Sequence, residues 1–383
     1  MTQLNLPLSK RQATFASLCL VDHLFLEIAR PLLYHEIHLD PSLHRNKTFS
    51  NYSKLINTLL FAPTCASFVR SIKITLKADA GDMDCIVFRS LLRRCKGLER
   101  VSTGWEEWKA PEAIGAQVIE AISKEAKSIK YLEIPSISLR LPPTLHIVNV
   151  LKELKSIVFK PTSLSPELVP VFGLQQVAWM SGFNRSALRR YLTSSYHTLT
   201  TLSCYIECKD PPMFDVFPNL STLRLLIGGF RTDQPTTTLK AMVETSRVEA
   251  VRSVLLSTHS ISVKHLTIAT KSSETARTLA DYSILEALPT TLVTLAVVPQ
   301  LLGILNLPAL LPLDQIKPYP SSLRRLTIIP PSFMNSLSTE SHELMKTVSR
   351  QVSKLLQNRE VDLSVELGAN FGDRYGVEQM CGL

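Results

Sequence analysis

The sequence has 383 residues, of which 45% are hydrophobic, and its 42 Lys and Arg against 33 Asp and Glu give a net charge of +9. This composition is too apolar for a disordered chain, and it supplies enough core for two or three ordinary domains or for one elongated repeat array. About 60 leucines, near one residue in six, stand against only 13 glycines, which argues against an enzyme built on glycine-rich nucleotide loops.

The segment from residue 9 to residue 61 has the apolar spacing of short helices. Ser9 and Gln12 have the spacing of a capping box, which predicts a helix beginning there. The apolar face of this helix would hold Phe15, Leu18 and Cys19. Asp22 is placed to cap a second short helix, and we expect Pro31 to end that helix near Arg30.

A third helix is predicted from apolar residues at positions i, i+3, i+4, i+7 and i+8. These residues are Tyr52, Leu55, Ile56, Leu59 and Leu60. Pro63 is expected to end the helix. Because only one face of such a helix is apolar, we expect it to lie against the segment that follows.

Beyond residue 66 one short motif recurs, with the pattern apolar-x-x-apolar-x-apolar, as in VRSIKI and LSTLRL. The second apolar position of its ten copies is Ile72, Val101, Leu132, Ile157, Val177, Leu202, Leu223, Leu266, Leu295 and Leu326. A weaker copy has Leu363 at this position. Most copies are 20 to 31 residues apart, which is the length of one strand plus one return segment.

The motif predicts parallel strands, because its last two apolar residues point to the same side of an extended chain. Stacked in parallel, such strands share one core, which the intervening helices close on the outer side. Helices of this kind are expected at 113–126 and 332–356. The pattern resembles the leucine-rich-repeat family over residues 66–367, and this resemblance implies an α/β solenoid, a horseshoe with parallel strands inside and helices outside.

The sequence departs from that family at the end of each motif. The family usually has Asn or Cys shortly after the last leucine, whereas this chain has mostly Pro, Thr or Ser, as in Pro135-Ser136 and Pro330-Pro331. We therefore expect a less regular curvature. The 43-residue gap between two copies predicts a longer helix within Thr236 to His259, and the stretch from Pro308 to Pro320 is either an ordered rim loop or a mobile flap.

Residues 18–39, LCLVDHLFLEIARPLLYHEIHL, resemble the second half of the F-box in fungal F-box and leucine-rich-repeat proteins. The resemblance implies a small helical module that docks on a Skp-type adaptor of a cullin ubiquitin ligase, while the repeats hold the substrate. The adaptor contacts implied by it are Leu18, Phe25, Ile28, Pro31 and Leu32. The chain then divides into a partial F-box-like segment (1–40), a solenoid (41–367) and a C-terminal tail (368–383).

The family module begins with a further amphipathic helix, whereas only Leu6-Pro7 precedes Ser9 here. We expect that first helix to be missing or very short. Three interpretations stay open: an F-box remnant that no longer docks, a native start upstream of Met1, or a short segment that suffices. In a purely structural alternative, the same apolar residues cap the exposed end of the solenoid.

The polar residues that alternate with the apolar strand residues are candidates for substrate contact, because they face solvent on the concave side. They are Lys73, Arg100, Tyr131, Glu133, Tyr205, Arg224, His265 and Arg325. Their mixed charge favours a protein partner over a polyanion. Trp105 and Trp108 are assigned to a rim loop, either as contact anchors or as residues that pack over the next helix.

Motifs for catalysis or cofactor binding are missing from the sequence. It has no glycine-rich phosphate loop, no G-x-S-x-G turn and no H-E-x-x-H helix. Asp79, Asp82 and Asp84 are expected to cap a helix beginning near Asp82, and Cys204 to be a small buried apolar residue. We therefore expect no enzymatic activity, no cofactor and no metal site.

Seven cysteines, an odd number, and a beginning without an apolar signal region indicate a reduced intracellular compartment, cytoplasmic or nuclear. The apolar run from Leu295 to Leu313 contains three prolines, which argues against a membrane span. Basic pairs are scattered and lack interleaved aromatic residues, which argues against nucleic acid as a partner.

The sequence thus predicts a non-catalytic protein-interaction adaptor. Taken with the F-box resemblance, it is expected to be a substrate receptor of an SCF-type ubiquitin ligase that binds its substrate through the concave face. The alternative is a leucine-rich-repeat interaction scaffold with no link to ubiquitin.

Overall fold

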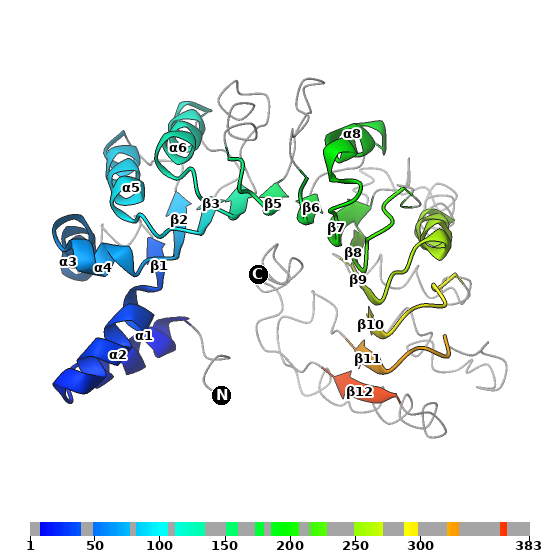
Figure 1. Ribbon diagram of the computed structural model, residues 1–383, viewed down its shortest axis with the longest axis horizontal. Coiled ribbons are helices and arrows are strands. Elements are labelled where there is room, and N and C mark those ends of the chain that lie inside the picture. The colour runs from blue at the N-terminus through cyan, green and yellow to red at the C-terminus, as the bar shows by residue number, and fades with distance from the viewer. Residues whose placement is uncertain are drawn as a thin grey trace, which may run out of the picture. The chain divides into compact units, whose positions relative to one another are not determined.

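The computed structural model describes residues 8–39, 49–76, 82–105, 112–134, 151–159, 173–179, 185–206, 214, 216–227, 249–270, 287–297, 320–328 and 361–365. The chain divides into two compact units, Met1–Phe172 and Gly173–Leu383. Each unit is of mixed α/β type, and its strands run parallel in the order of the sequence (Figure 1).

The described residues of the first unit form six helices and five strands. The helices are α1 (Leu8–Leu18), α2 (His23–Tyr34), α3 (Phe49–Phe61), α4 (Pro63–Ser67), α5 (Asp82–Arg94) and α6 (Glu112–Glu125). The strands are β1 (Glu36–Leu39), β2 (Ser71–Leu76), β3 (Arg100–Trp105), β4 (Tyr131–Ile134) and β5 (Ser156–Phe159).

The second unit has seven described strands and fewer described helices. The strands are β6 (Gln176–Trp179), β7 (Thr201–Ile206), β8 (Thr222–Ile227), β9 (His265–Thr270), β10 (Thr294–Val297), β11 (Arg325–Ile328) and β12 (Asp362–Val365). Between them lie α8 (Arg185–Tyr191), helical residues 249–257 and two short 3₁₀ helices, η3 (Thr193–Ser195) and η4 (Thr258–Ser260).

The strands predicted from the motif are confirmed, and they pair in the register that the motif implies. In the first unit Ile72 is the Cα partner of Val101, Val101 of Leu132, and Leu132 of Ile157. In the second unit the same position aligns from Val177 in β6 to Leu363 in β12. All ten residues at the second apolar position of the clear copies are at most 2% exposed.

Strands β2 to β5 and β7 to β11 begin with the same backbone contact, which sets this register. Two successive N–H groups donate to one carbonyl of the preceding segment: Glu99 and Arg100 to Arg70, at 2.8 and 2.9 Å. Lys130 and Tyr131 donate in the same way to Glu99, at 2.8 and 3.1 Å. The second unit repeats the pattern at β7 through β11. Because each carbonyl accepts from the next segment, the start of each of these strands is tied to the segment that precedes its neighbour.

Helices α5 and α6 cover the core side of the strands in the first unit (Figure 1). Their buried residues recur at helical spacing and are Cys85, Phe88, Leu91 and Leu92 in α5, and Ile114, Val118, Ile119 and Ile122 in α6. The helix predicted at 113–126 is thus confirmed. So is the helix predicted near Asp82, where α5 begins. The face opposite the helices carries the polar residues of the strands.

Two details of the predicted amino-terminal helices are wrong. Ser9 lies within α1 rather than before its first residue, and the side-chain amide of Gln12 donates to the Glu36 carbonyl at 3.0 Å. Pro31 does not end α2, which continues to Tyr34. Proline removes one hydrogen bond, at the carbonyl of Glu27, but Glu27 is exposed and water can serve that carbonyl. The predicted cap is confirmed, since Asp22 accepts from the His23 N–H.

Helix α3 confirms the third predicted helix, with Ile56 and Leu59 buried, and Pro63 begins α4. Residues 249–257 are helical, as expected within the long gap. The helix expected at 332–356 and the segment 308–319 lie outside the described residues.

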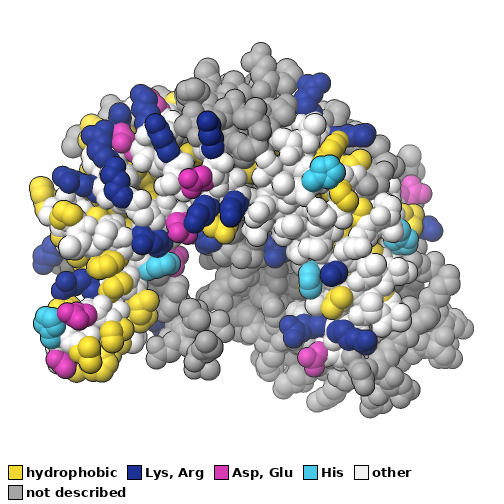
Figure 2. All heavy atoms as spheres, in the orientation of Figure 1, with side chains coloured by type: hydrophobic (Ala, Val, Ile, Leu, Met, Phe, Trp, Pro, Cys, Tyr) yellow, Lys and Arg dark blue, Asp and Glu magenta, His cyan; other side chains and the backbone are white. Residues whose placement is uncertain are grey.

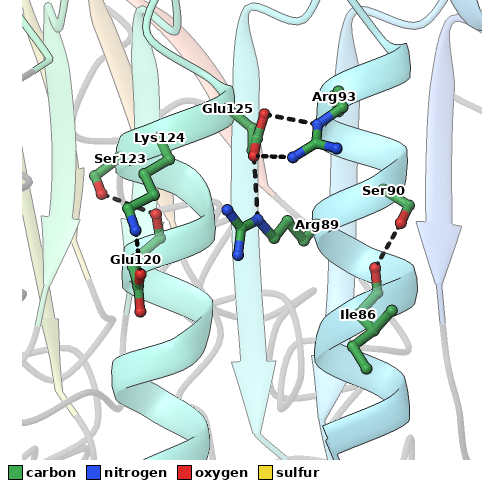
Figure 3. Close-up of polar contacts among 8 residues, drawn as sticks. All are labelled: Ile86, Arg89, Ser90, Arg93, Glu120, Ser123, Lys124 and Glu125. Atoms are coloured by element: carbon green, nitrogen blue, oxygen red, sulfur yellow. Dashed lines mark hydrogen bonds and ion pairs between the residues drawn. The ribbon is translucent and has the colours of Figure 1, made fainter.

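One ion-pair cluster joins α5 to α6 (Figure 3). The Glu125 carboxylate accepts from Arg89 Nε at 3.1 Å and from Arg93 Nη2 at 2.8 Å, and its side chain is only 13% exposed. Hydrogen bonds from Arg93 and Arg89 lower the pKa of Glu125 from its usual 4.5 to about 2. The charged carboxylate therefore stabilises the contact between two neighbouring helices.

We expect Glu125→Gln to lower the free energy of unfolding by about 1 kcal/mol at pH 7, since the carboxylate contacts two arginines. Because the pKa of Glu125 is lowered by folding, its contribution is fully present above pH 4.5 and fades as the pH falls towards about 2. Urea denaturation at pH 7 and near pH 2 measures this. A Glu120→Gln variant, which breaks the exposed pair with Lys124 on α6 alone, is the control.

A second prediction tests the strand register. Leu223→Ala is expected to cost about 2 to 5 kcal/mol, because Leu223 is 0% exposed in the stacked core. Arg224→Ala, one residue along β8, should change stability by less than about 0.5 kcal/mol because it alters the polar face. Chemical denaturation measures both, and equal small effects would contradict the register.

Candidate protein-interaction surfaces

Helix α2 has an inner face that packs on its own unit. Ala29 is 2% exposed, and Leu26, Leu33 and Tyr34 are partly buried on the same side. Burial and the neighbouring Cys65 of α4 raise the pKa of the Tyr34 hydroxyl. These inner-face residues recur at helical spacing and so lie on one side of α2, where the helix contacts α4 and β1. This inner face alone accounts for the packing of α2 on its unit.

The outer face of α2 is also apolar, but it is exposed. Leu24, Phe25, Ile28 and Leu32 are 61%, 43%, 58% and 48% exposed, and Leu20 and Val21, just before the helix, are 89% and 68% exposed. Figure 2 shows hydrophobic side chains gathered over α2. We call these six residues the α2 outer face. An apolar helix face that its own chain leaves uncovered is typical of a docking surface.

Three of the five predicted adaptor contacts, Phe25, Ile28 and Leu32, lie on the α2 outer face. Leu18 ends α1 and is partly buried, as is Pro31 within α2. The structural alternative, in which these apolar residues cap the end of the strand stack, agrees with the inner face of α2, which is packed on its unit. It does not account for the outer face, which is exposed. Leu20, Val21 and Leu24 also lie on the α2 outer face; they belong to the F-box-like stretch 18–39 but were not among the predicted adaptor contacts.

In the first unit the fold brings four predicted substrate residues together from three strands. Lys73 of β2, Ser102 of β3 and Glu133 of β4 occupy one row of the sheet, and Arg100 and Tyr131 are neighbours in the adjacent row. The Arg100 guanidinium lies 5.1 Å from the centre of the Tyr131 ring, a cation–π contact.

Ser102 organises this polar face. Its hydroxyl donates to Glu133 Oε2 at 2.6 Å, and Ser102 itself is only 5% exposed. The bond holds the Glu133 carboxylate over the middle of the sheet. A surface of fixed acid, base and aromatic groups selects a partner by charge complementarity and ring contact.

In the second unit His265 and Arg325 lie in one row, two strands apart, with Thr294 between them. The His265 Nδ1 atom lies 2.8 Å from the Thr294 hydroxyl. Arg224 lies in the adjacent row, opposite Thr267. Tyr205 is paired with Leu226 in the sheet, but its side chain lies outside the described residues.

Trp105 differs from the prediction of a rim loop. Trp105 is the last residue of β3 and pairs with Leu76 of β2, because the strand continues two residues beyond its apolar motif. Trp108 lies outside the described residues, as does the Trp105 side chain.

The described cysteines form no disulfide bond, and most of them are buried. Burial raises the pKa of the Cys95 thiol to about 12 and raises that of Cys204 as well, so both thiols stay protonated at neutral pH. Cys204 is 0% exposed, as expected for a small apolar core residue. In the described part of the chain, no group of His, Cys, Asp and Glu could hold a metal ion.

The described residues include no helix long and apolar enough to cross a membrane. Residues 294–297 of the apolar run form β10, and the rest of that run lies outside the described residues. Scans against models of known protein families and against curated proteins find no match to this chain.

Adjacent positions of α2 test whether its two faces differ as described. Ile28→Ser on the outer face is expected to change the free energy of unfolding by less than about 1 kcal/mol, because the side chain already contacts water. Ala29→Leu on the inner face should cost about 1 to 3 kcal/mol through overpacking. Denaturant unfolding measures both, and a larger cost for Ile28→Ser would contradict the assignment of the faces.

Proposed function

We propose that this protein is a non-catalytic interaction adaptor: an irregular leucine-rich-repeat solenoid whose amino-terminal helices form an F-box-like module. In this proposal the α2 outer face docks on a Skp-type adaptor of an SCF-type ubiquitin ligase inside the cell. The polar face of the strands binds the protein to be ubiquitinated.

The observation that carries the proposal is the second apolar face of α2. Four residues of one helix, Leu24, Phe25, Ile28 and Leu32, together expose a contiguous apolar stripe. Burying half of a large apolar side chain contributes about 1 kcal/mol, so a partner that covers the stripe gains several kcal/mol. Phe25, Ile28 and Leu32 of this stripe are among the residues through which the sequence resembles an F-box.

The strand face supports the second half of the proposal. Arg100, Tyr131 and Glu133 come from neighbouring strands and are held by a cation–π contact and by the Ser102 hydrogen bond. Rigid strands position such groups more precisely than loops do, which favours selection among protein partners. The alternative function is an interaction scaffold that uses this face without any link to ubiquitin.

Capture of a purified Skp-type adaptor separates the two functions. We expect the wild-type chain to capture the adaptor, and the double variant Phe25→Ala, Ile28→Ala to bind it at least about tenfold more weakly, since anchors at the centre of an interface dominate its energy. Circular dichroism of the variant checks that it is folded.

A matched control comes from the same unit. The double variant Phe61→Ala, Ile86→Ala removes the same residue types from exposed positions on α3 and α5, where they are 80% and 55% exposed. It should bind the adaptor as well as the wild type does. No capture by the wild type would reject the ligase link and leave the scaffold function, and equal losses in both variants would reject the α2 outer face.

A further inference from the structure

The turns that lead into β3, β4 and β5 place equivalent residues above one another. Each turn is closed by a hydrogen bond between residues three apart: Leu98 to Cys95, Ile129 to Ala126 and Leu154 to Leu151, at 3.0 to 3.3 Å. Because the strands that follow are in register, residues at equal distance from the buried motif position form columns at the amino-terminal edge of the strands.

One of these columns consists of lysines. Lys96, Lys127 and Lys152 each stand five residues before the buried motif position of their strand, and all three are exposed. Neighbouring strands are about 5 Å apart, so the three ammonium groups lie within about one Debye length of each other at 0.1 M salt. We call these residues the lysine column.

Further basic residues flank the lysine column on the same edge. Lys130 and Lys155 stand two residues before the motif position of β4 and β5, and Arg70 holds the same place before β2. The Arg70 guanidinium donates to the Ser67 carbonyl at 2.8 Å and lies where a Cβ atom on Gly97 would be, 1.6 Å from that position. Glycine at 97 therefore lets this cation lie across the turn next to Lys96.

Neutralising groups on this edge are few. Glu99 pairs with Lys130 at 3.3 Å, and Glu153 is exposed beside Lys152, whereas the lysine column forms no ion pair within the described residues. Figure 2 shows Lys and Arg side chains gathered over α5, α6 and the neighbouring turns, with fewer Asp and Glu. Stacked like charges repel each other, so a partner that neutralises them relieves an unfavourable interaction.

We propose that this edge binds an acidic polypeptide segment, a run of Asp and Glu on a partner protein. Two strand spacings, about 10 Å, match about three residues of an extended peptide, so carboxylates along such a peptide reach successive lysines. The unpaired groups of the column are lysines, which act as point charges, rather than arginines in the fork that suits phosphate. The three turns that carry the lysine column, residues 95–98, 126–129 and 151–154, contain no aromatic residue for stacking bases, which argues against single-stranded nucleic acid.

This surface is separate from the α2 outer face and from the polar strand face, and the proposal does not depend on the function of either. It also changes one sequence-based expectation. The basic residues were expected to be scattered, because they are 25 to 31 positions apart in the sequence. The strand register places three of them next to one another.

The test uses the full chain and a fluorescent peptide of about twelve residues rich in Glu and Asp, titrated by anisotropy. We expect the triple variant Lys96→Gln, Lys127→Gln, Lys152→Gln to bind the peptide about tenfold more weakly than the wild type, the combined effect of three surface ion pairs. Binding to the wild type should weaken as salt rises from about 50 to about 200 mM. A peptide with Gln and Asn in place of Glu and Asp should not bind.

The matched control removes the same charge elsewhere: Lys10→Gln, Lys54→Gln, Lys264→Gln, three exposed lysines outside this edge. It should change the affinity by less than about twofold. If both triple variants lost the same affinity for the peptide, the loss would be due to net charge rather than to the lysine column, and the proposal would be overturned. Tighter binding of the wild type to a DNA duplex of equal charge than to the peptide would overturn the choice of an acidic polypeptide.

Discussion

The register of the parallel strands depends on one backbone contact, the single carbonyl that accepts from two successive N–H groups of the next segment. This contact fixes where the strand begins, so the buried residue two positions after the first donor pairs with the buried motif residue of the neighbouring strand. A shift by one residue would turn every apolar side chain of a strand from the core to water, so the register is strongly determined. The polar rows and the lysine column follow from it, since the same register aligns both.

The strands could be predicted from the sequence because their signal is local. Leu223 and Leu225 alternate with Thr222 and Arg224, which is the pattern of a strand with one buried face. Because this pattern recurs every 20 to 31 residues in most copies, it predicts a series of parallel strands. Helices α3, α5 and α6 were predictable for the same reason, from apolar spacing and a capping aspartate.

Other features depend on contacts between distant residues and carried no local signal. Gln12 bonds to the carbonyl of Glu36 instead of capping its own helix, and Glu125 pairs with arginines of the preceding helix. Helix α2 continues through Pro31 at an exposed position, since Glu27, whose carbonyl loses its donor, is an exposed residue. The lysine column did have a sequence signal, since its members share one offset from the motif, but only a superposition of the copies makes the offset visible.

Helix α2 links this architecture to function because it is apolar on two sides. Its inner face packs on its own unit, whereas the outer face, with Phe25 and Ile28, is exposed in the described part of the chain and is the docking surface in our proposal. The most direct test is a photoreactive amino acid placed at position 28 and, in a second sample, at position 86, each irradiated with a Skp-type adaptor. We expect a crosslink to the adaptor from position 28 and none from position 86. A crosslink from position 86 alone, or from neither position, would contradict the account.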